Sequence, residues 1–450
     1  MRAIGKNLAG SGPSLLVLAC TGALAGMLSD GWRSDTLAWT SRVTNSREFC
    51  YSPDRTAQLG EIAAPGWAEG SAVSIRLLAA LKGSVIPAPS QQDSLAAAEG
   101  GDIVPCRSVS DPYPILHSIA VDPQNDLVVM SDSNRGTLLF YPRKEGNTGK
   151  QMTEPRWRVS GPATGMMFIA GVTIDPSRRE VYTVDNDIGD RMLVFHYGAE
   201  GNVKPQRVLF VPHGAWGVSL NPRRDEVAIS VEHLNDLLVY RREASEAEAP
   251  LRVISGTDTG LADPHGVFYD SIHDEIVVAN HGNWSPTTST SNPGMGGRFF
   301  PPSIRTFPGL ATGNVAASRV ISGSRTELNW PMGISVDTVH NEIAVANFGN
   351  NAILIFHRTD QGDVVPVRIL HGNLTGIAGP MGVAVDVRDD ELWVSNSDDH
   401  SALVFARTAE GNVSPKRVIR NAPPGTPVVG FGNPGALAYD SKRDELLVPN

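Results

Sequence analysis

The chain has 450 residues, of which 19% are charged, and its net charge is -10 at neutral pH. An acidic chain whose Lys and Arg residues form no run does not favour a phosphate-binding surface, so nucleic acid is not an expected partner. The 45 Gly and 32 Pro residues are typical of a turn-rich β protein rather than of a disordered chain.

The first residues have the features of an export signal. Basic residues precede a short apolar segment, 13–22, and residues 23–25 supply the small side chains of a cleavage site. We therefore expect residues 1–25 to be a signal peptide and the protein to be secreted or periplasmic. The alternative is a lipoprotein anchored through Cys20. The apolar segment is too short for a membrane span, and we expect no other.

The cysteines agree with export. The chain has three, and removal or lipidation of Cys20 leaves Cys50 and Cys106 as an even pair. In an oxidising compartment this pair is expected to form a disulfide. The alternative is two unpaired, buried thiols.

The segment before the repeats has no clear period. We expect residues 26–72 to be an N-terminal linker or cover. Residues 73–110 faintly resemble the outer strands of the later repeats, and a helix at 75–82 followed by a loop is an equal alternative.

Residues 331–370 are the clearest unit of the chain. They contain four short runs rich in Val, Ile and Phe, bounded by Asp, Asn, Gly or Pro, at 333–336, 342–346, 352–356 and 367–370. Runs of this length are too short for helices. The pattern predicts four antiparallel strands joined in order by tight turns.

The unit recurs along the chain. The first strand of each copy ends at Asp122, Asp175, Asn221, Asp270, Asp337, Asp386 and Asp440. A period of about 50 residues with four strands per period is typical of a β-propeller, in which neighbouring sheets bury each other's faces around an axis. The sequence therefore predicts an all-β protein with a propeller over residues 73–450.

The number of blades depends on how the ring closes. Seven first strands favour seven blades, with residues 73–110 supplying the outer strands that the last half-unit lacks. The alternative is six blades, with the C-terminal half-unit completing the first unit.

The repeated phrases resemble a known family. PMGISVD…NEIAVANFGNNAILIF, PMGVAVD…DELWVSNSDDHSALVF and PHGVFYD…DEIVVAN are similar to NHL repeats. The resemblance covers residues 112–450, although the second strand here ends more often on Asn than on the family's Asp. It implies a propeller, and members of this family serve as binding platforms, lyases or hydrolases.

Propeller geometry places the candidate site at one mouth of the axial channel. The variable residue of each Pro-x-Gly phrase and the end of each second strand are expected on the same face, and so is an insertion in the fourth unit at 284–303. The candidate ligand-binding residues are His117, Trp216, Glu232, His233, His265, Asn280, His281, Trp284, Asn347 and Asn396. A purely structural role remains open, because Asn and Asp at strand ends often hold turns.

Two classes of function remain. One is a binding scaffold, expected to be monomeric, for a protein, a glycan or a small ligand at the channel mouth. The other is an extracytoplasmic lyase or a lactone or ester hydrolase that uses a divalent metal, calcium or zinc, on the same face. The catalytic residues are unknown, because the sequence has no nucleophile elbow, P-loop, HExxH helix or dinucleotide fingerprint. The sequence also shows no convergent set of acid and base residues, and this favours the scaffold.

Overall fold

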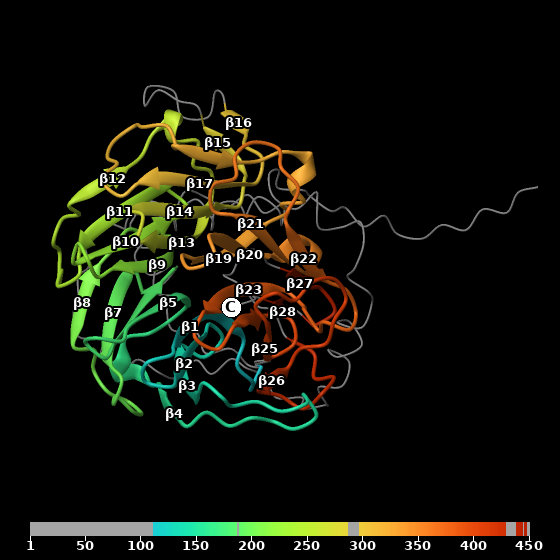
Figure 1. The fold of residues 1–450 in the computed structure, drawn as a ribbon. Helices are drawn as coiled ribbons and strands as arrows, with labels where there is room; N and C mark the ends of the chain where they lie inside the picture. The colour runs from blue at the N-terminus through green and yellow to red at the C-terminus, as the bar shows by residue number, and fades with distance from the viewer. Residues whose placement is uncertain (1–110, 187–188, 287–296, 429–437, 444, 448–450) are drawn as a thin grey trace, which may run out of the picture. The chain divides into compact units, whose positions relative to one another are not determined.

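The computed structural model describes residues 111–450 except 187–188, 287–296, 429–437, 444 and 448–450 (Figure 1). The export signal, the linker and both candidate disulfide cysteines lie outside the described residues. Within the described ranges, no helix has the length and hydropathy that crossing a bilayer requires.

Six antiparallel sheets of four strands follow one another along the chain, each with its strands in sequence order (Figure 1). Blade 1 consists of β1 Leu116–Asp122, β2 Leu127–Asp132, β3 Thr137–Pro142 and β4 Trp157–Val159. Blade 2 consists of β5 Ile169–Asp175, β6 Glu180–Asp185, β7 Arg191–His196 and β8 Arg207–Phe210. Blade 3 consists of β9 Ala215–Asn221, β10 Glu226–Val231, β11 Asp236–Arg241 and β12 Arg252–Ile254.

The second half of the ring repeats this order. Blade 4 consists of β13 Pro264–Asp270, β14 Glu275–Asn280, β17 Ser303–Pro308 and β18 Arg319–Ile321. Blade 5 consists of β19 Pro331–Asp337, β20 Glu342–Asn347, β21 Ala352–His357 and β22 Arg368–His371. Blade 6 consists of β23 Pro380–Asp386, β24 Glu391–Asn396, β25 Ser401–Ala406 and β26 Arg417–Arg420.

The remaining elements are short. In the blade 4 insertion, β15 Trp284–Pro286 pairs with β16 Gly297–Phe299, and near the C-terminus β27 Ala438–Asp440 pairs with β28 Glu445–Leu447. The described residues also contain the 3₁₀ turns η1 Pro162–Thr164, η2 Thr257–Thr259, η3 Ser324–Thr326 and η4 Phe348–Asn350.

The core of the protein lies between the blades. Among the described residues, six clusters of buried apolar side chains each join two neighbouring sheets, so the faces of adjacent blades cover each other. One of these clusters packs Val128 and Met130 of β2 against Trp393 of β24. Blade 1 therefore lies directly against blade 6, and this contact closes the ring.

The expectation of seven blades is wrong, and the alternative of six is confirmed. At the closure, the backbone N–H of Asn147 donates to the Val418 carbonyl at 2.9 Å, and the buried Arg143 guanidinium pairs with Asp386 at 2.6 Å. The first unit has four strands of its own, so the half-unit β27–β28 does not complete it and stays a two-stranded sheet. Residues 73–110, which were expected to supply outer strands, lie outside the described residues.

The repeated Asp at the end of each first strand holds the following turn. In blade 1, the Asp122 Oδ1 accepts the backbone N–H groups of Gln124 and Asn125 at 2.8 and 3.1 Å. The equivalent residue of every other described blade makes the same turn. This bonding explains why Asp or Asn recurs at the end of each first strand.

The Pro-x-Gly phrase marks a close approach between blades. The pairing of the first and second strands shifts register at this phrase, which is a β-bulge. A Cβ placed on Gly333 would lie 2.6 Å from the carbonyl oxygen of Met381, the variable residue of the next blade, and Gly217 is similarly 2.5 Å from the His265 carbonyl oxygen. Glycine is needed because it leaves room for the neighbouring backbone, and the bulge turns the variable residue toward the axis.

Candidate functional site

Three positions in each blade form one ring of residues at the end of the axial channel. They are the residue before the first strand, the variable residue two positions later, and the residue after the second strand. A backbone hydrogen bond of 2.8–3.1 Å joins the first and third positions in all six blades. We call these residues the mouth ring. Blade 1 contributes Ile115, His117 and Ser133, blade 2 contributes Phe168, Ala170 and Asn186, and blade 3 contributes Gly214, Trp216 and Glu232. Blade 4 contributes Asp263, His265 and His281, blade 5 contributes Trp330, Met332 and Phe348, and blade 6 contributes Gly379, Met381 and Ser397.

Seven aromatic or imidazole rings of the mouth ring touch in sequence across blades 1 to 5. The centroid distances along this arc are 5.5 Å for Phe168–His117, 5.0 Å for His117–Trp216, 4.2 Å for Trp216–His265, 4.6 Å for His265–His281, 5.1 Å for His281–Trp330 and 6.2 Å for Trp330–Phe348. His117 and His265 are buried, and the other five rings are half-buried. The arc therefore presents ring surface to solvent while two of its imidazoles are enclosed.

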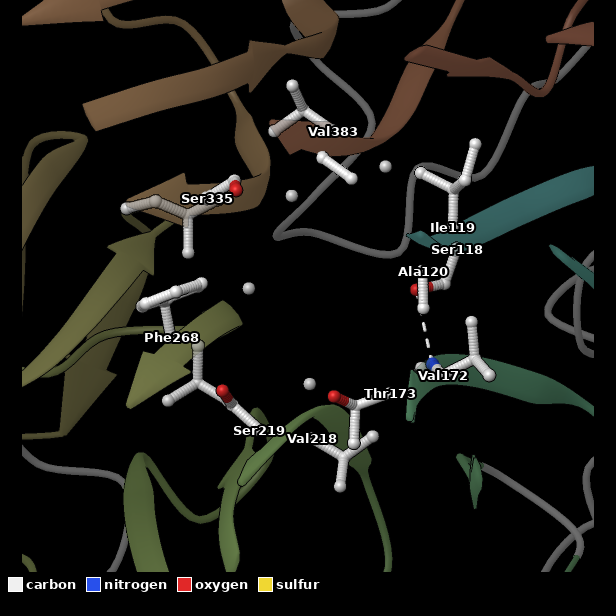
Figure 2. A pocket seen from close by; sticks show the side chains of 18 of the residues that line it. Ser118, Ile119, Ala120, Val172, Thr173, Val218, Ser219, Phe268, Ser335 and Val383 are labelled. Carbon is white, nitrogen blue, oxygen red and sulfur yellow. Dashed lines mark hydrogen bonds between the residues drawn. The ribbon is translucent and has the colours of Figure 1, made fainter. Parts of the chain in front are cut away.

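The arc borders an axial cavity of about 260 Å³ that the first strands of all six blades line, and His117 and Trp216 belong to this lining. Figure 2 shows small hydroxyl side chains and apolar side chains facing the space. The Ser118, Ser219 and Ser335 hydroxyls each accept a backbone N–H of the next blade, at 3.1, 2.9 and 3.3 Å. These hydroxyls therefore join neighbouring blades.

The corner of blade 4 carries the densest group of polar side chains in the described ring. The His281 Nδ1 lies 2.9 Å from the Asp263 carboxylate, and the His265 Nδ1 lies 3.0 Å from the Asp263 carbonyl and 3.5 Å from its carboxylate. On its other side, the His265 Nε2 lies 3.3 Å from the Glu232 carboxylate. Asn186 donates to the same carboxylate at 3.1 Å, so groups from blades 2, 3 and 4 meet here.

Burial and pairing set the charges of this corner. Burial lowers the pKa of His265 to about 4, and it lowers the pKa of His117 to about 4 as well. Burial raises the pKa of Asp263, but the hydrogen bond from His281 and the neighbouring imidazoles outweigh it, so that the pKa lies below its ordinary value. At neutral pH, His117 and His265 are therefore neutral imidazoles and Asp263 is a carboxylate.

The structure brings only some of the predicted residues together. His117, Trp216, Glu232, His265 and His281 belong to the mouth ring. His233 is exposed next to it, where its ring stacks on His213 at 5.0 Å and its Nε2 lies 3.4 Å from Glu232. Trp284 begins β15 in the blade 4 insertion.

The three asparagines that end second strands have a different location. Asn280, Asn347 and Asn396 are fully buried, and each Oδ1 accepts a backbone N–H of the loop that enters the first strand, at 2.7, 2.7 and 3.2 Å. They orient that loop, and the next residue along the chain occupies the mouth ring.

Four residues of the mouth ring that carry an aromatic ring or a carboxylate were not among the predicted candidates: Phe168, Asp263, Trp330 and Phe348. Asp263 and Trp330 directly precede the prolines of their Pro-x-Gly phrases, and both have left-handed backbone, with φ of 59° and 50°. The equivalent residues of blades 3 and 6 are glycines with positive φ. A non-glycine residue at a position where other blades have glycine is the signal that could have identified Asp263 and Trp330.

A second group of acidic side chains lies in blade 6, away from the mouth ring. Asp386, Asp389 and Glu391 have the types and proximity of metal ligands. Cations of the chain already neutralise them: Arg143 pairs with both aspartates, and Arg417 bonds Glu391 at 2.7 and 2.9 Å. This cluster is therefore an ion-pair network that ties blade 1 to blade 6.

No family model matches the chain, and neither does any curated protein. Solved structures that resemble it include Kuenenia stuttgartiensis hydrazine synthase, at 11% identity over 68% of this chain and 99% of that one, with a TM-score of 0.45. A chain of a nidogen/laminin complex matches at 16% identity over 68% and 95%, with a TM-score of 0.40. A functionally unknown Desulfotomaculum acetoxidans protein matches at 15% over 68% and 90%, with a TM-score of 0.45. Likeness this distant carries no argument about function.

Proposed function

We propose that this protein is a ligand-binding propeller and that its site is the arc of rings over the channel mouth. The observation that carries the proposal is the continuity of seven rings from Phe168 to Phe348 across five blades. Half-buried indoles bordered by a few buried polar groups are the usual composition of a small-molecule site, which combines an apolar wall with placed hydrogen-bonding groups.

The shape of the mouth narrows the class of ligand. The axial cavity, at about 260 Å³, lies just below the 300–1,000 Å³ typical of sites that enclose a drug-sized molecule. A ligand would therefore lie across the arc and insert at most a small group into the channel. The flat faces of Trp216 and Trp330 suit the C–H face of a sugar ring or a planar group. The carboxylates of Glu232 and Asp263 can accept hydrogen bonds from the hydroxyl or N–H groups of such a ligand.

The test is a screen of soluble oligosaccharides and small planar compounds against the intact protein, read by indole fluorescence and by the shift in melting temperature. We expect compounds that bind the wild type to lose at least tenfold in affinity in Trp216→Ala and Trp330→Ala. Trp157→Ala is the matched control, because Trp157 stacks on Phe140 in the outer part of blade 1 and is not in the mouth ring. Equal binding by the Trp216, Trp330 and Trp157 variants would place the site elsewhere.

A second candidate is an enzyme, a lyase or a lactone or ester hydrolase with a divalent metal at the mouth. The observation that favours it is the cluster of Asp263, His265 and His281 beside the arc. Turnover of lactones, esters or uronic-acid oligosaccharides that a chelator abolishes and added metal restores would favour this candidate over the scaffold.

We further propose that the chain is exported and acts as a monomer, and that its repeats are of the NHL type. Export rests on residues 1–25, and the NHL assignment rests on the Pro-x-Gly phrases. Expression of the full chain with its N-terminus intact tests export. A mature mass that begins near residue 26 supports cleavage, and a lipid mass on Cys20 supports the lipoprotein alternative.

A further inference from the structure

Blade 4 differs from the other five blades in what it places in the mouth ring. All three of its positions carry metal-ligand side chains: Asp263, His265 and His281. Each offers one donor atom, and the three donor atoms lie within 4.8 Å of one another. In the other five blades, no more than one of the three positions has a carboxylate or an imidazole.

The cluster has no cation of its own among its recorded partners. The Asp263 carboxylate contacts the imidazoles of His265 and His281 and the amide of Asn283, in contrast with the blade 6 carboxylates, which meet Arg and Lys. The hydrogen bond from His281 stabilises the charge of this carboxylate, and among the described residues no Arg or Lys is recorded against its oxygens. The Nε2 of His281 is buried without a hydrogen-bond partner in the described structure, which leaves one polar atom of the cluster unsatisfied.

The backbone conformation of Asp263 is a further argument for a ligand role. Its φ of 59° matches the left-handed conformation that glycines provide at the equivalent positions, Gly214 and Gly379. A side chain held there costs roughly 1 kcal/mol or more in local strain. In this conformation the Asp263 carboxylate contacts both imidazoles. The chain therefore brings three ligand side chains together at a position where glycine would be less strained.

We propose that Asp263, His265 and His281 form a binding site for a divalent transition-metal ion at the mouth of the channel. Glu232 lies 3.3 Å from the Nε2 of His265, where it can orient that imidazole by accepting its outer N–H. Three ligands from two segments of one blade leave a coordination position for a ligand or for water.

The donor types select the class of metal. Two imidazoles and one carboxylate suit Zn²⁺, Fe²⁺ or Co²⁺, whereas Ca²⁺ takes six to eight oxygen ligands, which this corner does not supply. Trp216 lies 4.2 Å from His265 and Trp330 lies 5.1 Å from His281, centroid to centroid, so both indoles border the site. A ligand lying on the arc would have its polar groups within reach of the ion.

The experiment uses the intact protein, stripped with a chelator and titrated with Zn²⁺ alone against a chromophoric chelator. We expect one tight site per chain, and Co²⁺ in its place should give visible d–d absorption and quench indole fluorescence. His281→Ala and Asp263→Asn should each weaken Zn²⁺ binding at least 100-fold. Both positions are only partly buried, and circular dichroism checks that the variants fold.

Two control variants separate this site from other histidines. His340→Ala removes an imidazole that also pairs with a carboxylate, Asp337 at 2.7 Å, but outside the mouth ring, and we expect unchanged binding. His213→Ala tests the exposed His213–His233 pair and should also leave binding unchanged. Substoichiometric binding, unchanged affinity in His281→Ala, or loss of the site in either control would overturn the proposal. The ligand proposal does not depend on this result, because the titration contains only the metal.

Discussion

Replacement of Gly333 by alanine tests whether the Pro-x-Gly phrase needs glycine because the backbones of neighbouring blades approach closely there. The added Cβ would meet three backbone atoms of blade 6: the Met381 carbonyl oxygen at 2.6 Å, the Gly382 Cα at 2.9 Å and the Val383 nitrogen at 3.1 Å. Backbone cannot rotate away as a side chain can, so blades 5 and 6 must separate by about 0.8 Å for the first of these contacts to reach van der Waals distance.

The expected loss is at the upper end of the range for overpacking, about 3 kcal/mol of unfolding free energy. At about 2 °C per kcal/mol for a domain of this size, the melting temperature should fall by about 6 °C. Differential scanning calorimetry and the urea midpoint measure the loss independently.

Gly411→Ala is the matched control for this substitution. Gly411 has a positive φ of 69° but nothing within 4 Å of the added Cβ, so only the conformational cost of about 1 kcal/mol applies. If Gly333→Ala is no more destabilising than Gly411→Ala, the steric explanation of the repeat motif is wrong.

Two further predictions concern the ion pairs and the buried asparagines. Burial raises the pKa of Glu391, but hydrogen bonds from Arg417 and Lys416 outweigh it and lower the pKa to about 2, from an ordinary 4.5. Because the folded pKa is depressed, the contribution to stability is complete above pH 4.5 and is lost as the pH falls toward 2; we expect about 1–2 kcal/mol after solvent screening. Across this pH range, the urea midpoint of Glu391→Gln should fall less than the midpoint of the wild type. An equal fall in both proteins would contradict the assignment of this pH dependence to Glu391. Asn347→Ala should cost about 1–3 kcal/mol, because it leaves the Asn329 N–H and the Glu327 carbonyl unpaired, whereas exposed Asn373→Ala should cost almost nothing.

The repeat unit could be predicted from the sequence because its signals are local. The four runs expected in residues 331–370 are β19 to β22, with bounds within a few residues. Turn residues and short runs of Val, Ile and Phe act within one blade, so each copy carries its own evidence.

The number of blades could not be predicted because closure is not local. The half-unit β27–β28 has the same pattern as the start of any blade. Whether it joins the ring depends on which sheet packs against blade 1, and that is decided by the fit of Trp393 against Val128 and Met130. Those residues are more than 260 positions apart in the sequence, beyond the reach of a local pattern.

The placement of the candidate residues was predicted in part, with an offset of one residue. The variable residues His117, Trp216 and His265 are in the mouth ring as expected, since the bulge turns them there. Second-strand ends such as Asn280 face the loop instead, because successive residues of a strand point in opposite directions and a shift of one position reverses the face. The residue that follows, His281, reaches the mouth.

Trp330 offers a test that separates strain from function. Its φ of 50° is left-handed, and its half-buried ring contacts only His281 and Phe348 among recorded ring partners. Glycine at this position removes the strain, worth about 1 kcal/mol, but loses roughly 2 kcal/mol of indole packing, about half the value for a fully buried ring. Alanine loses the same packing and keeps the strain.

Trp330→Gly should therefore be more stable than Trp330→Ala by about 1 kcal/mol, although alanine is the less flexible residue in the unfolded chain. Both variants should lose the ligand of the arc to the same extent, because both lack the indole. Urea denaturation measures the first quantity and fluorescence-independent calorimetric titration the second. If alanine proves the more stable variant, the left-handed backbone is not strained; if binding survives in both, Trp330 is there for packing and the ligand site does not extend to blade 5. A glycine variant that folds but no longer binds would show that the mouth needs the Trp330 ring for its ligand and not only for packing.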